Sequence, residues 1–267
     1  MSSPILKIDS ITMRFGGLVA VNRFSMELGS NDLVGVIGPN GAGKTTIFNM
    51  VTGHYEPTEG TVYLSGKNIN GLRPAFITQS GIARTFQNIR LFKDLTVLDN
   101  IRLAAHYTVE YGLFANIFRT KKYHAEEKRV HDEAMELLKI FGLENKKHHL
   151  AKNLPYGEQR RLEIARALAT KPKVLLLDEP AAGMNPKETK DLTELIRWVR
   201  DKFQIAVLLI EHDMKLVMEV CERIYVVDHG ELIAQGAPKD IQSNPKVIEA
   251  YLGTSETEET GPTPGEA

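Results

Sequence analysis

Residues 38–45 read G-P-N-G-A-G-K-T and directly follow the apolar run 33–37. An apolar run of this length before glycines, with helix-forming residues after them, predicts a buried strand, a tight loop and a helix. The spacing G-x-x-x-x-G-K-[ST] is that of the phosphate-binding loop. In such a loop, successive backbone N–H groups and the N-terminus of the helix face one phosphate. The sequence therefore predicts that the chain binds a nucleoside triphosphate.

Each residue type in this loop has a physical role. Its glycines permit backbone conformations that other residues rarely adopt. The Lys44 ammonium is expected to bind the β- and γ-phosphates, and the Thr45 hydroxyl is expected to ligate Mg²⁺. The residues expected to contact ATP through the loop are Gly38, Pro39, Asn40, Gly41, Ala42, Gly43, Lys44, Thr45 and Thr46.

Composition limits the other roles of the chain. Of its 267 residues, 42% are hydrophobic and 25% are charged, which is typical of a globular protein. The net charge of −1 gives no reason to expect nucleic acid as a partner. The single cysteine, Cys221, excludes an intramolecular disulfide and is expected in the core. No signal pattern begins the chain and apolar runs such as 205–210 are too short to cross a bilayer, so a membrane role would require a partner.

The order of patterns along the chain divides it into three zones. Residues 5–71 are rich in predicted strands, with a hairpin whose strands are near 61–64 and 68–69. Residues 84–157 are mostly helical in pattern. From 157 to 223 predicted strands and helices alternate, which favours a parallel sheet covered by helices. The periodic apolar residues of the helical zone are Val130, Ala134, Leu137, Leu138 and Phe141, with Gly142 at the expected C-terminal cap.

Within and after the third zone, shorter segments are predicted. Strands are expected at 174–177 and 205–210, each followed by a helix, near 187–202 and 214–221. A closing hairpin is expected at 224–227 and 231–234, around His229 and Gly230. Residues 254–267 form an acidic, proline-bearing tail without core residues, which we expect to be disordered.

A second nucleotide motif ends the apolar run 174–177. Asp178 and Glu179 follow that run directly. Such carboxylates are common at strand ends, but in a chain that also has a phosphate-binding loop they are candidates for nucleotide hydrolysis. Asp178 can hold the Mg²⁺ shell, and Glu179 can orient and deprotonate an attacking water.

Six motifs in order identify a family resemblance. They are the phosphate-binding loop, R-T-F-Q at 84–87, L-P-Y-G-E-Q at 154–159, L-L-L-D-E-P at 175–180, A-A-G-M-N-P at 181–186 and E-H-D at 211–213. This order resembles that of the ATP-binding cassette (ABC) ATPases, and the resemblance runs from about residue 6 to 253. It implies an α/β fold with a parallel-sheet core, an N-terminal antiparallel β subdomain and a helical subdomain at about 88–160. Residues 6–253 would form one ABC ATPase domain.

The resemblance also implies roles for individual residues. Gln87 would contact Mg²⁺ and the γ-phosphate, Glu179 would be the general base, and His212 would contact the γ-phosphate. Phe15 lies where an aromatic ring stacks on adenine, although it could equally be a core residue. The signature residues, which would contact ATP bound to the opposite subunit of a head-to-tail dimer, are Leu154, Pro155, Tyr156, Gly157, Glu158 and Gln159.

Longer stretches of sequence indicate a particular subfamily of the ABC ATPases. Residues 13–21, 84–92, 181–189 and 211–218 are similar to the larger ATPase subunit, the LivG type, of branched-chain amino acid importers. That subunit has an insertion after the glutamine loop, which corresponds here to 107–123. The resemblance implies a second ATPase subunit, identical or different, two transmembrane permease subunits and an extracytoplasmic solute-binding protein. The chain would then be a peripheral protein at the cytoplasmic face of the inner membrane, and urea or amides remain alternative solutes.

One departure and one alternative accompany this interpretation. Pro155 stands where the common signature has serine, and proline offers neither a hydroxyl nor an N–H donor. The alternative function is a soluble, non-transport cassette ATPase acting on ribosomes or nucleic acid. Transport is favoured because the chain has one cassette and no sustained heptads, and because Leu91 and Phe92 would line a groove for a permease helix.

Overall fold

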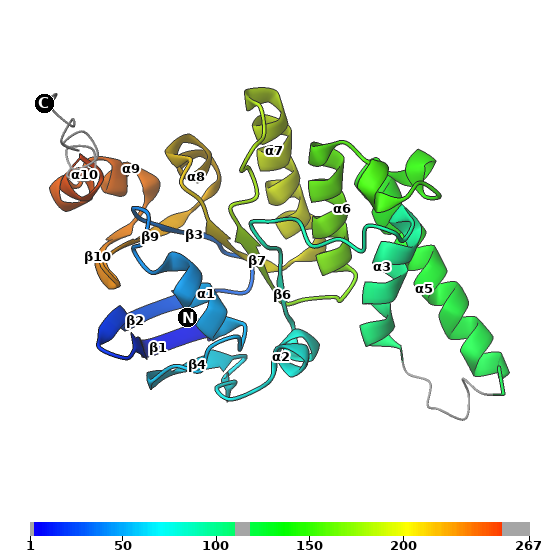
Figure 1. Ribbon diagram of the computed structural model, residues 1–267, viewed down its shortest axis with the longest axis horizontal. Helices are drawn as coiled ribbons and strands as arrows, with labels where there is room; N and C mark the ends of the chain where they lie inside the picture. The colour runs from blue at the N-terminus through cyan, green and yellow to red at the C-terminus, as the bar shows by residue number, and fades with distance from the viewer. Residues whose placement is uncertain (1–2, 110–117, 253–267) are drawn as a thin grey trace, which may run out of the picture.

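The computed structural model describes residues 3–109 and 118–252, and their strands form two sheets (Figure 1). The smaller sheet is antiparallel with the order β2-β1-β4-β5, and the larger has the order β10-β9-β3-β8-β7-β6. The smaller sheet contains β1 (Leu6–Phe15), β2 (Leu18–Leu28), β4 (Glu59–Leu64) and β5 (Lys67–Asn68). The larger sheet contains β3 (Leu33–Ile37), β6 (Ile82–Arg84), β7 (Val174–Asp178), β8 (Ala206–Ile210), β9 (Arg223–Asp228) and β10 (Glu231–Gly236).

The pairing in the larger sheet determines where the predicted motifs meet. All its pairs are parallel except β9 with β10, so the carboxyl ends of β3, β7 and β8 lie at one edge. β8 pairs with both β3 and β7. The phosphate-binding loop follows β3, Asp178 ends β7 with Glu179 directly after it, and His212 follows β8. Ligands of such sheets bind outside the carboxyl ends of the strands, which is where these motifs are gathered.

Two hydrophobic cores lie on the two faces of this sheet. Side chains alternate along each strand, so an uninterrupted apolar run serves both faces. Val34 and Val36 of β3 enter one core, and Leu33 and Ile37 enter the other. The first core lies against the antiparallel sheet and α1, and the second lies against α6, α7 and α8 (Figure 1). The helices of this part are α1 (Lys44–Val51), α2 (Pro74–Ser80), α6 (Tyr156–Leu168), α7 (Pro186–Phe203), α8 (Met214–Val220), α9 (Pro238–Gln242) and α10 (Pro245–Leu252).

The helical zone projects at the end of the molecule opposite α10 (Figure 1). It contains α3 (Val97–Ala105) and α5 (Lys121–Ile140), with short 3-10 turns η1 (His106–Thr108), η2 (Glu144–Lys146) and η3 (Ala151–Asn153). The periodic residues predicted for α5 are buried, and Gly142 follows the helix with a positive φ of 69°. The α5 prediction is therefore confirmed. Residues 110–117 of the predicted insertion lie outside the described residues.

Both predicted hairpins are present, with bounds that differ by one or two residues. Their turns use left-handed residues: Ser65 and Gly66 between β4 and β5, and His229 and Gly230 between β9 and β10. Cys221 is buried, as predicted, and its burial raises the pKa of the thiol. The predicted tail, 254–267, lies outside the described residues. Among the helices of 3–109 and 118–252, none combines the length and apolar character that a membrane span requires.

Candidate nucleotide site

The phosphate-binding loop joins β3 to α1 in a conformation that requires glycine. Gly38 and Gly43 have φ values of 155° and 100°. A Cβ atom on Gly38 would lie 1.9 Å from the Val227 carbonyl oxygen, and one on Gly43 would lie 2.6 Å from that of Ala20. Neither contact is sterically possible, so the loop can pack against β2 and β9 only with glycine at both positions.

The loop forms one wall of a cavity of about 510 Å³. The other walls come from β2, from the end of β7 and from the β9–β10 turn. A cavity of this size is typical of small-molecule sites. Its lining residues are Leu18, Val19, Ala20, Asn40, Gly41, Ala42, Gly43, Lys44, Thr45, Thr46, Glu179 and His229. The structure thus joins most of the loop to Glu179, which the sequence places far from it.

Lys44 is buried beneath the loop. Its Nζ donates hydrogen bonds to the carbonyl oxygens of Gly38 at 2.7 Å and Pro39 at 2.8 Å. Burial lowers the pKa of the ammonium, and the carboxylates of Glu179 and Asp178 oppose that shift. The residue is therefore a desolvated cation whose partners are two neutral carbonyl groups. An anion beside it would compensate the charge better than these carbonyls do.

Gln87, Glu179 and His212 converge although they come from three segments. Gln87 Nε2 donates to Glu179 Oε2 at 2.7 Å, and His212 Nδ1 lies 3.6 Å from the same oxygen. Glu179 has a left-handed backbone with φ of 44°, and its N–H donates to the Ile210 carbonyl of β8. Such a conformation is costly for a residue other than glycine, and strained residues of this kind cluster at functional sites.

Arg84 is a site residue whose role the sequence did not indicate. Its guanidinium donates to Asp178 Oδ2 at 2.7 Å and to Asn49 Oδ1 at 2.7 Å. The same group lies over the rings of Phe48 and Phe86. One oxygen of Asp178 is therefore already paired by a buried cation. The only sequence signal was the position of Arg84 at the start of the R-T-F-Q motif.

Glu211 is a second residue without a predicted role. Its side chain is completely buried at the end of β8, where burial raises the pKa of the carboxyl group. It accepts hydrogen bonds from the N–H groups of Ala181 at 2.8 Å and His212 at 3.2 Å. Glu211 thereby joins the loop that follows Glu179 to the loop that carries His212. The first letter of the E-H-D motif was the available signal.

The donors expected for Mg²⁺ are oxygen atoms, as that ion requires. Thr45 offers a hydroxyl, Gln87 an amide oxygen and Asp178 a carboxylate oxygen. The described residues contain no cluster of three His, Cys, Asp or Glu side chains that could hold a metal by itself. Mg²⁺ in nucleotide sites is usually bound through one or two carboxylates together with phosphate oxygens and water, and Asp178 is the carboxylate of this set. The donor set fits an ion bound together with a nucleotide.

Phe15 is not a core residue. Its side chain is 42% exposed, and its ring packs edge-on against Tyr55 with a centroid separation of 5.3 Å. The core alternative is therefore wrong. An exposed aromatic ring at the end of β1 can still stack on a base, although Phe15 does not line the 510 Å³ cavity.

The signature segment begins α6 and lies apart from the phosphate-binding loop. Pro155 is the N-cap residue, and the N–H groups of Glu158 and Gln159 donate to its carbonyl oxygen at 3.0 Å. Leu154 is buried, Tyr156 donates from its hydroxyl to the Ala182 carbonyl, and Glu158 pairs with Lys146. A separate cavity of about 210 Å³ is lined by Pro155, Gly157, Glu158, Arg161, Met184, Glu188 and Leu192. It shares no lining residue with the loop cavity.

Comparison with known proteins places these features in a family. The family model described as ABC transporter matches residues 21–182, and the model described as branched-chain amino acid ATP-binding cassette transporter matches residues 231–257. The high-affinity branched-chain amino acid transport ATP-binding protein LivG of Escherichia coli is 49% identical over 95% of this chain and 99% of its own length.

Two solved structures share the fold. The ADP conformation of MJ1267, an ATP-binding cassette of an ABC transporter, superposes with a TM-score of 0.82 at 34% identity, covering 94% of this chain and all of that one. The dimeric structure of MJ0796, a bacterial ABC transporter cassette, has a TM-score of 0.73 at 25% identity, covering 87% and 98%. The predicted fold class is confirmed, and a non-transport cassette is not favoured.

Proposed function

The chain belongs to the ABC transporter family, and we propose that it is the ATP-hydrolysing subunit of an importer for branched-chain amino acids. The observation that carries the proposal is the shared cavity of Lys44, Thr45 and Glu179 at the carboxyl ends of β3 and β7. A cation for phosphate, a hydroxyl donor and a carboxylate base are thereby brought together. The names of the relatives support the choice of solute.

ATP binding would begin with the phosphates and Lys44. The ammonium exchanges its two carbonyl partners for phosphate oxygens, which satisfies a buried charge. Backbone N–H groups of the loop and the start of α1 surround the same oxygens. Phe15 stacks on the adenine. Thr45, Gln87 and Asp178 would hold Mg²⁺ together with phosphate, and the bound ion would neutralise phosphate charge.

Hydrolysis would use the three residues that converge at the edge of the sheet. Glu179 orients a water molecule for attack on the γ-phosphorus and accepts its proton. The bond between Gln87 Nε2 and Glu179 Oε2 determines the direction of the carboxylate. His212, beside the same oxygen, contacts the γ-phosphate and holds the reacting geometry. Phosphoryl transfer depends mainly on positioning and charge, which these side chains provide.

A head-to-tail dimer would complete each site. Pro155, Gly157 and Glu158 of the signature line a different cavity from that of the phosphate-binding loop, so within one chain the signature does not reach the ATP bound to the loop. In a dimer the N-terminus of α6 faces the ATP bound to the opposite subunit and offers N–H donors and a dipole. The MJ0796 cassette has been solved as a dimer, which supports a dimeric working unit.

The remaining partners follow from an importer function. The chain would lie on the cytoplasmic face of the inner membrane, bound to two permease subunits and paired with a second ATPase subunit. An extracytoplasmic binding protein would deliver the solute. Phe92 is half exposed, which suits contact with a permease helix. Leu91 is partly buried against the core that contains Leu33 and Ile37.

The test of hydrolysis is Glu179→Gln in the full-length chain. Loss of a general base lowers turnover by about 10²–10⁴-fold, while ATP binding persists because Lys44 and the loop are unchanged. Glu219→Gln on α8 is the control, since that carboxylate is exposed and pairs with Arg197. ATP binding is measured by calorimetry and turnover by phosphate release. Turnover of Glu179→Gln within a few-fold of the unmodified chain would contradict the proposed base.

The test of the solute is uptake of labelled leucine by cells from which this chain has been deleted. Return of uptake with the unmodified chain, but not with Glu179→Gln, would support branched-chain amino acid import. Labelled urea and acetamide serve as parallel solutes. Restored uptake of either of these, with leucine uptake unaffected by the deletion, would show that the solute is wrong while the ATPase function stands.

A further inference from the structure

Arg160 and Glu163 form a fully buried ion pair in α6, and Arg160 directly follows the last residue of the signature segment. Arg160 Nη1 donates to Glu163 Oε2 at 2.7 Å, and the two side chains are 0% and 2% exposed. Burying two charges carries a large desolvation cost, and an apolar pair of similar volume often stabilises a fold as well or better. Stability alone therefore does not account for this pair.

The remaining partners of the pair lie in the backbone segment that carries Gln87. Arg160 donates to the Phe86 carbonyl at 2.7 Å and to the Gln87 carbonyl at 2.8 Å. Glu163 Oε1 accepts from the N–H of Arg90 at 3.1 Å. The pair thus binds three backbone groups within five residues, and we name it the Arg160–Glu163 clamp.

The clamp restrains Gln87, whose side chain contacts the expected general base, Glu179. The carbonyl of Gln87 is held by Arg160, while its side chain donates to Glu179 at 2.7 Å. The first residue of α6 is tied to the loop after Glu179, because the Tyr156 hydroxyl donates to the Ala182 carbonyl at 2.9 Å. Helix α6 therefore contacts both sides of the Gln87–Glu179 bond.

We infer that the Arg160–Glu163 clamp positions Gln87 for hydrolysis and makes its reach to Glu179 depend on where α6 lies. The inference rests on the proposed function, in which the N-terminus of α6 faces ATP bound to the partner subunit. A helix moves as a rigid element, so movement of α6 toward that ATP carries the clamped segment with it. ATP binding at the partner's site would then change the position of Gln87 relative to Glu179 in this chain.

The first test compares Arg160→Met with Arg160→Lys. The methionine variant should bind ATP with a Kd within about twofold of the unmodified chain, because the phosphate-binding loop is untouched. Its kcat should fall by roughly 10- to 100-fold, as expected when a reacting group is misplaced by about 1 Å. Lysine can still donate to a carbonyl of the segment and should restore part of kcat. If Arg160→Met does not fold, Glu163→Gln, which weakens the hold on Arg90, should lower kcat severalfold.

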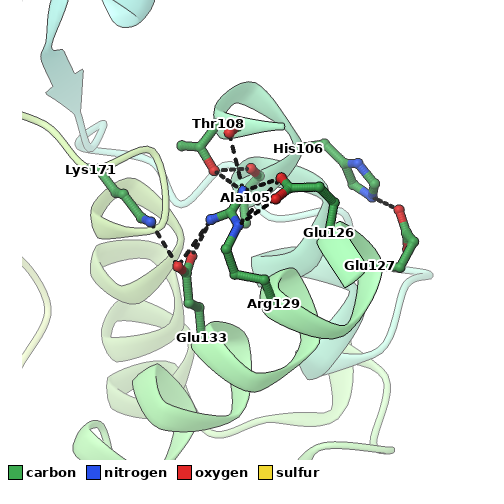
Figure 2. Close-up of polar contacts among 8 residues, drawn as sticks. All are labelled: Ala105, His106, Thr108, Glu126, Glu127, Arg129, Glu133 and Lys171. Carbon is green, nitrogen blue, oxygen red and sulfur yellow. Dashed lines mark hydrogen bonds and ion pairs between the residues drawn. The ribbon is translucent and has the colours of Figure 1, made fainter. Parts of the chain in front are cut away.

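Arg129→Met is the matched control. Arg129 of α5 also joins two segments of the helical zone, since it pairs with Glu126 and Glu133 and donates to the Thr108 carbonyl (Figure 2). Its contacts do not include the Gln87 segment. The control should lose stability while keeping kcat within about twofold. An Arg160→Met kcat equal to that of Arg129→Met, or a changed Kd with unchanged kcat, would overturn the inference.

The second test uses hydrogen exchange to measure whether ATP at the partner's site affects the Gln87 segment, without requiring hydrolysis. In the assembled transporter, Lys44→Ala in only one ATPase subunit prevents that subunit's loop from binding ATP but leaves its signature able to contact the partner's ATP. Adding ATP should slow amide hydrogen exchange at 86–90, and adding Arg160→Met should abolish that slowing. Unchanged exchange in the Lys44→Ala chain would refute the transmission. If the unmodified chain binds no ATP, the proposed function itself fails, which is a separate result.

Discussion

Arg84 donates a 2.7 Å hydrogen bond to Oδ2 of Asp178 across the β6–β7 pair, and their side chains are only 6% and 5% exposed. The carboxylate proposed to help hold Mg²⁺ is thus oriented by a cation from the neighbouring strand. Among the residues that the structure describes, none donates a hydrogen bond to its second oxygen, which is therefore the one suited to a metal or its water shell. The structure adds Arg84 to the residues on which the site depends.

Arg84→Met should destabilise the chain strongly. Removing one member of a buried ion pair leaves the other charge unpaired and costs about 3–5 kcal/mol. Lys7→Met is the comparison, because Lys7 pairs with Glu27 at an exposed position, where such pairs contribute about 0–1 kcal/mol. Urea unfolding of both variants measures the difference. Equal losses for the two variants would show that the buried pair has no special weight.

Glu211→Gln should change how stability depends on pH. Burial raises the pKa of Glu211, so above the unfolded value of about 4.3 the folded chain holds a proton that the unfolded chain has lost. Stability contributed by this group therefore falls as pH rises through the raised folded pKa. Glutamine can still accept from Ala181 and carries no charge, so the variant should gain stability relative to the unmodified chain with rising pH. Thermal unfolding from pH 4 to 8 measures it, and parallel curves would contradict the assignment.

Pro155→Ser tests the N-cap of α6. A serine side chain can accept from an N–H group of the first turn, which contributes about 0.5–2 kcal/mol. Loss of the restricted proline backbone offsets about 0.4–1 kcal/mol of this. We expect a small net stabilisation, measured by urea unfolding. A loss of stability would show that the proline backbone matters more than a cap.

The same substitution tests whether the two ATP sites of the complex are unequal. If this chain pairs with a different ATPase subunit, its signature serves only the partner's ATP. Pro155→Ser should then speed turnover of the assembled complex when Glu179→Gln already disables this chain's own site, and change it little otherwise. No effect in either background would mean that the serine hydroxyl is irrelevant to hydrolysis.

Phe92→Glu should separate ATP binding from assembly with the permease. Phe92 is 50% exposed, so a charge there leaves the core intact while opposing contact with an apolar helix. Phe76→Glu is the control, since Phe76 is 54% exposed and belongs to α2, outside the segment that follows Gln87. Co-purification with the transmembrane subunits measures assembly. Recovery of those subunits at the normal ratio with Phe92→Glu would place the contact elsewhere.

Local patterns predicted much of the fold because they report short-range constraints. The phosphate-binding loop needed only its glycine spacing, and the α5 prediction needed only the apolar period from Val130 to Phe141. Both hairpins were predicted around residue pairs that end in glycine, Ser65-Gly66 and His229-Gly230, and both pairs have left-handed backbones in the structure. The predicted ends differed by a residue or two because hydrogen bonding to neighbouring strands, rather than composition, decides where a strand ends.

Phe15 shows where such patterns fail. An aromatic residue at the end of an apolar alternation suits a core position and a binding position equally. Its exposure, and its edge contact with Tyr55, result from how far β1 extends beyond the sheet core. Phe15 pairs with Leu18 of β2, which is close in sequence, but the pairing of β1 with β4 ends at Thr12, and β4 is remote from Phe15 in the sequence.

The sequence by itself determined the phosphate-binding loop, the strand-end carboxylates and the family, because each is written in contiguous residues with characteristic spacing. Only the tertiary structure decided that Arg84 pairs with Asp178, that Glu211 is buried, and that Arg160 holds the segment carrying Gln87. These contacts join residues far apart in the chain. A charged side chain looks the same in sequence whether water or a buried partner surrounds it, and only packing distinguishes the two.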